Sequence, residues 1–135
     1  MSPNEIFEKM MSRDAFSRLL GMQLGEVGAG FCTLKMMVSA EMVNGFGVAH
    51  GGITFALADS AFAFACNSHG RMAVSVECSI SHVAPVFEGD ELTARCREQF
   101  LGKKLSNYAC EITNQNGETV ALFKSTAFRK AEIWA

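Results

Sequence analysis

An apolar run from Gly51 to Ser68 contains one charged residue, Asp59, and follows directly on His50. The run reads GGITFALADSAFAFACNS, and its apolar residues leave no polar face, which predicts a helix that is buried nearly all round. A carboxylate on such a helix is costly to bury unless it is paired, hydrogen-bonded or protonated. Asp59 is therefore a candidate catalytic acid, base or nucleophile, and the glycine pair at the helix start is a candidate anion-stabilising site.

The size and composition of the chain favour a single folded domain over residues 1–135, since 135 residues can bury a useful core. Hydrophobic residues make up 49% and charged residues 19%, which excludes a disordered tail. The net charge is −2 and no basic patch is present, so we expect no nucleic-acid partner. The Gly51–Ser68 run is short and carries Asp59 in its middle, so we expect a buried helix and no membrane insertion.

The cysteines and the N-terminus favour a cytoplasmic protein. Residues 1–14, MSPNEIFEKMMSRD, contain acidic residues and no apolar core run, which is not typical of a secretory signal. The five cysteines are an odd number and lie far apart, so reduced thiols are expected. No CxxC or HxxxH pattern occurs, and we therefore expect no metal site.

The remaining pattern predicts short helices followed by strands. Residues 1–20 are expected to form an N-terminal helical segment, with Phe16, Leu19 and Leu20 of its second helix facing inward. Apolar residues alternate with polar ones over residues 32–38, 74–81, 92–97, 108–112 and 119–129, which predicts strands. Asn116-Gly117 is a strong hairpin signal, and short turns imply antiparallel neighbours. A helix that is apolar all round needs a curved sheet wrapped about it, so the sequence predicts an α+β fold with one central helix.

The segment from Asn44 to Ser68, NGFGVAHGGITFALADSAFAFACNS, resembles the hotdog-fold thioesterases, and within them the phenylacetic acid degradation type. The resemblance rests on Asn44, on His50-Gly51-Gly52 six residues later, and on Asp59 eight residues after Gly51. It covers the chain from about Leu20 to Arg129. It implies a hotdog fold, in which a curved antiparallel sheet wraps around one long central helix.

The resemblance also implies roles for these residues. Asn44 matches the asparagine that positions the substrate or the attacking water, Gly51 matches the glycine whose backbone N–H polarises the thioester carbonyl, and Asp59 matches the catalytic carboxylate. The implied activity is hydrolysis of acyl-CoA, with aryl or arylacetyl groups such as phenylacetyl favoured, and with coenzyme A as part of the substrate and no separate cofactor. Members of this type often carry Arg-Pro near the position where Ala84 precedes Pro85 here, and this departure bears on the substrate range.

The chemistry of thioester hydrolysis fits these residue types. A backbone N–H at a helix N-terminus points at the oxyanion that develops on the carbonyl, and a side chain at Gly51 would obstruct the thioester. Asp59 then acts as general base toward water, or attacks the carbonyl itself to form an anhydride, and the sequence does not separate these routes.

Further candidates surround this pair, each with a structural alternative. His50 and Gly52 are expected to contact the substrate, with His50 as a supporting hydrogen-bond donor and a catalytic base as its alternative role. Ser75 is expected to lie near the site or else on a plain strand face. Lys103 and Lys104 follow a glycine in a turn, where they contact the phosphates of coenzyme A or are only solvated.

The spacing of Gly51 and Asp59 predicts a shared site. Eight residues on one helix correspond to about 12 Å along its axis, whereas a reacting carbonyl must lie within about 3 Å of both groups. An antiparallel helix from a second subunit can bring its Asp59 beside this Gly51, so we expect a homodimer with two shared sites. The resemblance further favours a homotetramer, and the eleven Phe and eight Met residues agree with extensive interfaces.

Two other functions stay open. The first is a hotdog hydratase or dehydratase acting on acyl thioesters, whose chemistry uses a histidine–acid pair, and Asp59 has no histidine near it on its helix. The second is a non-catalytic acyl-CoA-binding domain of the sensing kind. Such sensors usually carry a DNA-binding module, for which we expect no room in 135 residues.

Overall fold

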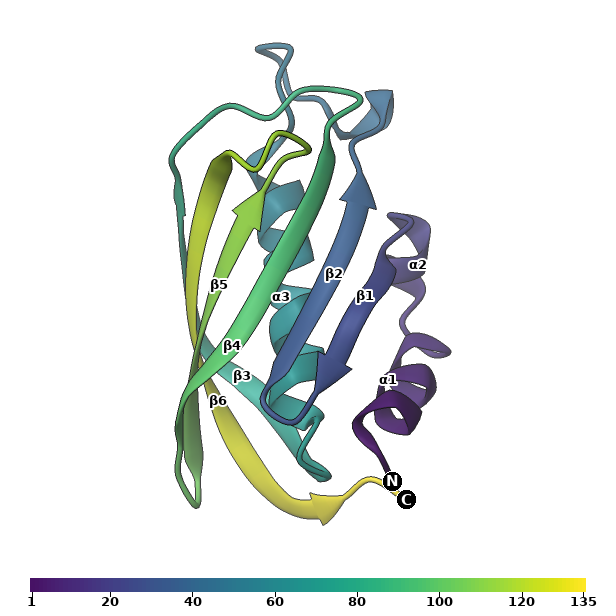
Figure 1. Ribbon diagram of the computed structural model, residues 1–135, viewed down its shortest axis with the longest axis vertical. Coiled ribbons are helices and arrows are strands. Elements are labelled where there is room, and N and C mark those ends of the chain that lie inside the picture. Colours follow the sequence, from purple (N-terminus) through teal and green to yellow (C-terminus); the bar gives the residue numbers. More distant parts are fainter.

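The computed structural model describes residues 1–135 and shows a curved six-stranded sheet around one long helix, α3 (Gly51–Asn67) (Figure 1). All neighbouring strands are antiparallel, in the order β1-β2-β4-β5-β6-β3. The predicted α+β arrangement with a central helix is confirmed. The other elements are α1 (Pro3–Met11), α2 (Ala15–Leu19), β1 (Gln23–Gly28), β2 (Phe31–Met37), a 3-10 turn (Ala40–Met42), β3 (Arg71–His82), β4 (Glu91–Leu101), β5 (Leu105–Thr113) and β6 (Thr119–Ile133).

The helix α3 begins and ends within one residue of the predicted apolar run. Its sheet-facing side, which includes Leu57, Ala61 and Ala65, is fully buried against the concave face. A stripe at spacings of three and four residues stays partly or wholly exposed: Gly52, Ala56, Asp59, Ser60 and Ala63. The prediction of burial nearly all round therefore holds for the sheet side, and the stripe is left without a partner in a single chain.

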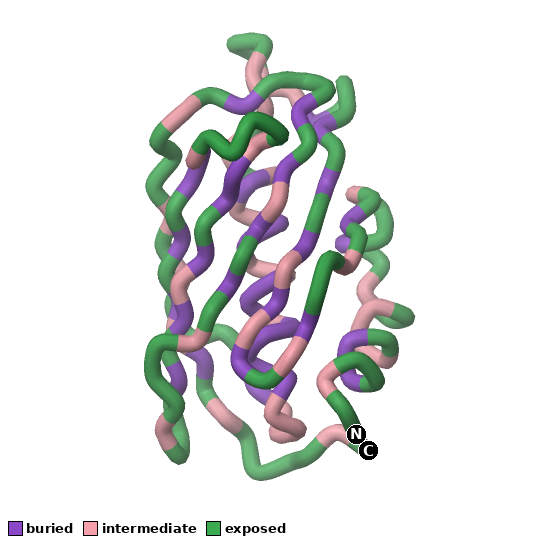
Figure 2. The backbone as a smooth tube through the Cα atoms, in the orientation of Figure 1, coloured by how far each residue is buried: buried purple, intermediate pink, exposed green.

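The strands of the sheet bury alternate residues, as Figure 2 shows along β4 and β5. Cys32, Cys96 and Cys110 are paired in register across β2, β4 and β5, and all three are buried. Burial raises the pKa of the Cys32 thiol to about 12, so this thiol stays protonated and fills space. All five cysteines are free thiols.

The strand β3 lies at one edge of the sheet and departs from the predicted alternation. Val74 and Val76, expected on the apolar face, are 46% and 61% exposed. The pairing of β3 with β6 shifts register between Ser75 and Glu77, and such a bulge interrupts the alternation of the side chains. As an edge strand, β3 also offers unpaired backbone groups along one side.

The N-terminal helical segment lies beside α3, close to the C-terminus of the chain (Figure 1). A capping box between Ser2 and Glu5 starts α1, which buries Ile6 and Phe7. The predicted second helix is present as α2, but the inward orientation expected of Phe16 and Leu19 was wrong, because these side chains are 56% and 78% exposed.

The buried residue of α2 is Ser17. Its hydroxyl is hydrogen-bonded to Asp14 Oδ2 and lies 2.8 Å from Ser60 Oγ of α3. This five-residue helix therefore contacts the core through a polar hydrogen-bonded residue, although Leu20, which follows it, packs against the core as expected. No helix of the protein is both long and apolar enough to cross a lipid bilayer.

Candidate active site

A hollow of about 420 Å³ lies at the N-terminus of α3. It is formed where the loop before α3, the first turn of α3 and the end of β3 come together. Its lining includes Asn44, Gly51, Thr54, His82 and Pro85. The structure thus brings the predicted Asn44 and Gly51 into one site.

Gly51 is the first residue of α3, and its backbone N–H has no acceptor within the chain. The first N–H groups of a helix have no intrahelical partner and lie at the positive end of its dipole. Because Gly51 lines the hollow, its unpaired N–H is available to stabilise an oxyanion that develops there.

Both glycines lie close to the side chains beside them. A Cβ atom at position 51 would lie 3.0 Å from Cε1 of His82, and one at position 52 would lie 2.9 Å from Nδ1 of His50. A side chain at either position would displace an imidazole ring. Close packing against His82 therefore favours glycine at position 51, in addition to the access for a thioester that the sequence predicts.

His50 is the N-cap of α3, and its Nδ1 accepts the Gly52 N–H at 2.8 Å. This bond satisfies one of the unpaired helix donors and leaves the Gly51 N–H free. The bond requires an unprotonated Nδ1. The structure therefore gives His50 and Gly52 a role in capping the helix, and their contact with the substrate stays a prediction.

Asn44 holds the loop that precedes α3. Its side-chain Oδ1 accepts the Phe46 N–H at 2.8 Å and the Val48 N–H at 3.3 Å, an arrangement typical of an Asx turn. Its amide nitrogen has no partner in the chain and Asn44 lines the hollow, so that nitrogen can donate to a ligand. Asn44 therefore stabilises the turn, and its free amide nitrogen is compatible with the substrate-positioning role that the resemblance implies.

Asp59 lies in a different hollow, also of about 420 Å³, together with Ser75 of β3. Burial raises the pKa of the Asp59 carboxyl, and the nearby Asp14 raises it further, whereas a weak hydrogen bond from Cys78 Sγ at 3.8 Å acts against this. Burial and the Asp59 charge raise the pKa of the Cys78 thiol to about 11, so it remains the proton donor in this contact. A carboxylate with a raised pKa is a better general base than an exposed one.

The two hollows share no lining residue within one chain. The eight residues between Gly51 and Asp59 span about 12 Å of α3. Lys103 and Lys104 are exposed in the turn between β4 and β5, which lies at the opposite end of the sheet from the Asn44 loop (Figure 1). A single chain therefore brings neither Asp59 nor the two lysines to the Gly51 hollow.

His82 and Thr54, for which no sequence pattern indicates a role, meet in the Gly51 hollow. His82 Nε2 lies 2.6 Å from Thr54 Oγ1, and the Thr54 hydroxyl is also within 3.0 Å of the Gly51 carbonyl. The contact joins the end of β3 to the first turn of α3, and no local sequence pattern indicates it. The residue pair therefore holds together two elements that line the Gly51 hollow.

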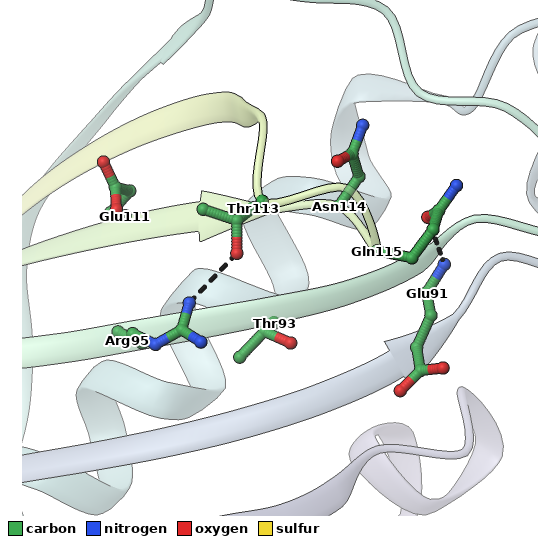
Figure 3. Close-up of a pocket in the computed structure, with 8 residues that line it drawn as sticks. Glu91, Thr93, Arg95, Glu111, Thr113, Asn114 and Gln115 are labelled. Atoms are coloured by element: carbon green, nitrogen blue, oxygen red, sulfur yellow. Dashed lines mark hydrogen bonds between the residues drawn. The ribbon is translucent and has the colours of Figure 1, made fainter.

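A third hollow, of about 570 Å³, lies on the outer face of the sheet (Figure 3). It is lined by polar residues and Gly117, and Arg95 Nη1 donates to Thr113 Oγ1 across it at 3.0 Å. Thr93 and Arg95 alternate with the buried Leu92 and Ala94, so the sheet separates this hollow from α3. None of the predicted site residues lies in it.

Known proteins match the chain along most of its length. The model of the Thioesterase superfamily matches residues 46–121. The acyl-coenzyme A thioesterase PaaI of Escherichia coli (strain K12) is 43% identical over 120 residues, which cover 89% of this chain and 86% of that protein.

Solved structures agree with the sequence comparison. The structure of the E. coli PaaI protein from the phenylacetic acid degradation operon has a TM-score of 0.95 and 40% identity, over 97% of this chain and 95% of that chain. A hypothetical thioesterase from Streptococcus pneumoniae TIGR4, solved with coenzyme A, has a TM-score of 0.87 and 25% identity, over 93% and 98% of the two chains. The hotdog fold expected from the sequence is confirmed, and the chain belongs to the thioesterase superfamily, within its hotdog-fold enzymes of the PaaI-like type.

Proposed function

We propose that the protein hydrolyses acyl-CoA thioesters with ring-containing acyl groups, such as phenylacetyl-CoA, to the free acid and coenzyme A. The observation that carries this proposal is the unpaired Gly51 N–H at the start of α3, with the half-buried Asp59 on the exposed stripe of the same helix. The names of the E. coli relative and of the coenzyme A-bound neighbour support the substrate class.

The reaction needs one donor and one base. The Gly51 N–H donates to the carbonyl oxygen while Asp59 takes a proton from water, and the water oxygen forms a bond to the carbonyl carbon. The C–S bond then breaks, sulfur takes the electron pair, and the proton held by Asp59 passes to the thiolate. In the second route the Asp59 carboxylate attacks the carbonyl and expels the thiolate, and water then hydrolyses the anhydride.

The site of this reaction is completed by a second copy of the chain. The exposed stripe on α3 and the edge strand β3 are unpartnered in one chain, and both lie beside Asp59. An antiparallel contact between two α3 helices places Asp59 of each subunit near Gly51 of the other, which gives two equal sites. We extend this to a homotetramer of two such dimers.

The other predicted residues take supporting roles in this proposal. Asn44 offers its free amide nitrogen in the Gly51 hollow, and His50 caps the helix through Gly52. Ser75 lies in the Asp59 hollow, where its hydroxyl can hold the attacking water. Lys103 and Lys104 are exposed cations that can meet the phosphates of coenzyme A bound to a neighbouring subunit.

One observation favours a hydratase as the second candidate function. His82 lies against Gly51, so a shared site would bring it toward the catalytic carboxylate of the partner subunit. This would form the histidine–acid pair that the residues of α3 alone do not provide. The family comparisons favour the hydrolase.

The decisive assay follows free-thiol release from phenylacetyl-CoA colorimetrically, in parallel with hydration of crotonyl-CoA followed by loss of enoyl absorbance. We expect thiol release by the wild type, none above background by Asp59→Asn, and no hydration by either. Hydration without thiol release would replace the hydrolase with the hydratase, and binding without either reaction would indicate a non-catalytic acyl-CoA-binding protein.

A further inference from the structure

The hollow beside Asp59 extends away from it as a mostly apolar cavity. Eight of its twelve lining residues are hydrophobic, and its volume of about 420 Å³ is in the range of small-molecule sites. Its walls come from four segments that are distant in the sequence: Met10 of α1; Phe62, Ala63 and Cys66 of α3; Met72 and Val74 of β3; and Trp134 near the C-terminus. Two flexible methionines let such a cavity adapt to the shape of an apolar group.

The helix α3 gives this cavity a direction and a length. Asp59, Ala63 and Asn67 are four residues apart, so they follow one face of α3, and all three line the cavity. From Asp59 to Asn67 the helix advances about 12 Å. The carboxylate therefore lies at one end of the cavity and Asn67 lies at the other.

Trp134 closes the end opposite to Asp59. Its indole Nε1–H donates to Oδ1 of Asn67 at 2.9 Å, and its backbone N–H donates to the Gly70 carbonyl at 2.8 Å. Asn67 is itself buried and fixed, because its Oδ1 also accepts the Ala73 N–H at 2.9 Å. Two hydrogen bonds thus hold an aromatic ring as a wall at the far end of an apolar cavity.

We propose that this cavity receives the acyl group and that Trp134 is a specificity-determining residue, which selects arylacetyl and medium-length acyl groups over long chains. The inference rests on the proposed thioesterase function, with the reacting carbonyl beside Asp59. An extended alkyl chain advances roughly 1.3 Å per carbon, given C–C bonds of about 1.5 Å, so roughly nine carbons fill the distance to Trp134. A phenylacetyl group fits within this length, and a hexadecanoyl chain meets the indole.

A binding test uses the fact that Trp134 is the single tryptophan of the chain, so its emission, excited at a wavelength that Tyr108 does not absorb, reports on this cavity. The probe is a non-hydrolysable analogue of phenylacetyl-CoA in which a methylene group replaces the thioester sulfur, with coenzyme A as the control. We expect a saturable change in Trp134 emission with the analogue and none with coenzyme A. The variant Cys66→Phe narrows the cavity between Asp59 and Trp134 from the buried side of α3, away from the exposed stripe, and in a folded protein it should abolish the change.

This readout does not depend on turnover, so it separates the cavity proposal from the proposed function. An emission change without thiol release from any acyl-CoA would keep the acyl-binding cavity and refute the thioesterase. No emission change in a wild type that hydrolyses phenylacetyl-CoA, or an equal change with coenzyme A alone, would refute the cavity proposal.

A specificity test compares kcat/KM for phenylacetyl-, octanoyl- and hexadecanoyl-CoA. In Trp134→Ala we expect the hexadecanoyl-to-phenylacetyl ratio to rise at least about tenfold, since removing a pocket wall changes discrimination on this scale. Trp134→Phe, which keeps an aromatic wall, should change the ratio less. The matched control is Ile133→Ala, because the neighbouring Ile133 side chain is 64% exposed and does not line the cavity. An unchanged ratio in a folded Trp134→Ala protein would overturn the assignment of Trp134.

Discussion

Replacement of Asp59 by asparagine tests both the chemistry and the energetics of the site. The amide keeps the shape of the side chain but can neither accept the proton from water nor attack the thioester. We expect kcat to fall by at least about a hundredfold, the order of magnitude lost with a general base. The control is Glu26→Gln, which neutralises an exposed carboxylate on β1 without a partner in the chain and should leave kcat unchanged.

The same replacement should stabilise the fold at neutral pH. Burial raises the pKa of Asp59 in the native state above the value of about 3.9 in the unfolded chain. The native state therefore binds this proton more tightly, and ionisation of Asp59 lowers the stability as pH rises from the unfolded pKa through the native one. Asp59→Asn removes this loss, so its free energy of unfolding exceeds that of the wild type at pH 7.

Urea unfolding at a series of pH values measures this difference. The gain in stability of Asp59→Asn should shrink as pH falls through the raised pKa, and disappear below the ordinary value of about 3.9. The acid limb of kcat/KM for the wild type should likewise titrate above that value. A variant less stable than the wild type at pH 7, or an unaltered kcat in a folded variant, would refute the reasoning.

Three further outcomes follow from the supporting contacts. His50→Ala should lower the free energy of unfolding by about 1 kcal/mol, as the loss of other N-caps does. In chemical denaturation, His50→Asn should have most of the wild-type stability, and equal stability of the two variants would contradict the capping role. Replacing Lys103 and Lys104 together by Ser should raise KM for acyl-CoA but not for an acyl-pantetheine thioester, which lacks the nucleotide phosphates. An equal rise in KM for both substrates would contradict a contact between these lysines and the phosphates. Light scattering should give about four times the chain mass of 14.6 kDa, and a mass of two chains would refute the tetramer but not the shared site.

The central part of the fold was predictable because local pattern and burial agree there. The apolar run around Asp59 predicted α3 almost to the residue, and period-two alternation predicted the strands that bury Leu92, Cys110 and their neighbours. A residue whose position is set by one periodic element can be assigned from that period alone.

The errors lie where tertiary contacts override the local pattern. The apolar Phe16 and Leu19 are exposed because α2 is a single short turn anchored through Ser17, and the bulge in β3 cannot be seen from its alternating residues. His82 and Trp134 depend on contacts with residues 28 and 67 positions away in the sequence, so no window of the sequence indicates that they line the two hollows.

Subunit mixing tests most directly the claim that each active site combines Gly51 of one subunit with Asp59 of another. Asp59→Asn and Gly51→Pro subunits are each expected to be inactive, since proline removes the N–H at position 51. In a mixed dimer one site carries both lesions and the other is intact. Random exchange of equal amounts makes half the dimers mixed, so activity should recover to about a quarter of the wild-type value. No recovery, with exchange verified by native mass spectrometry, would place both groups in one subunit's own site and contradict the account.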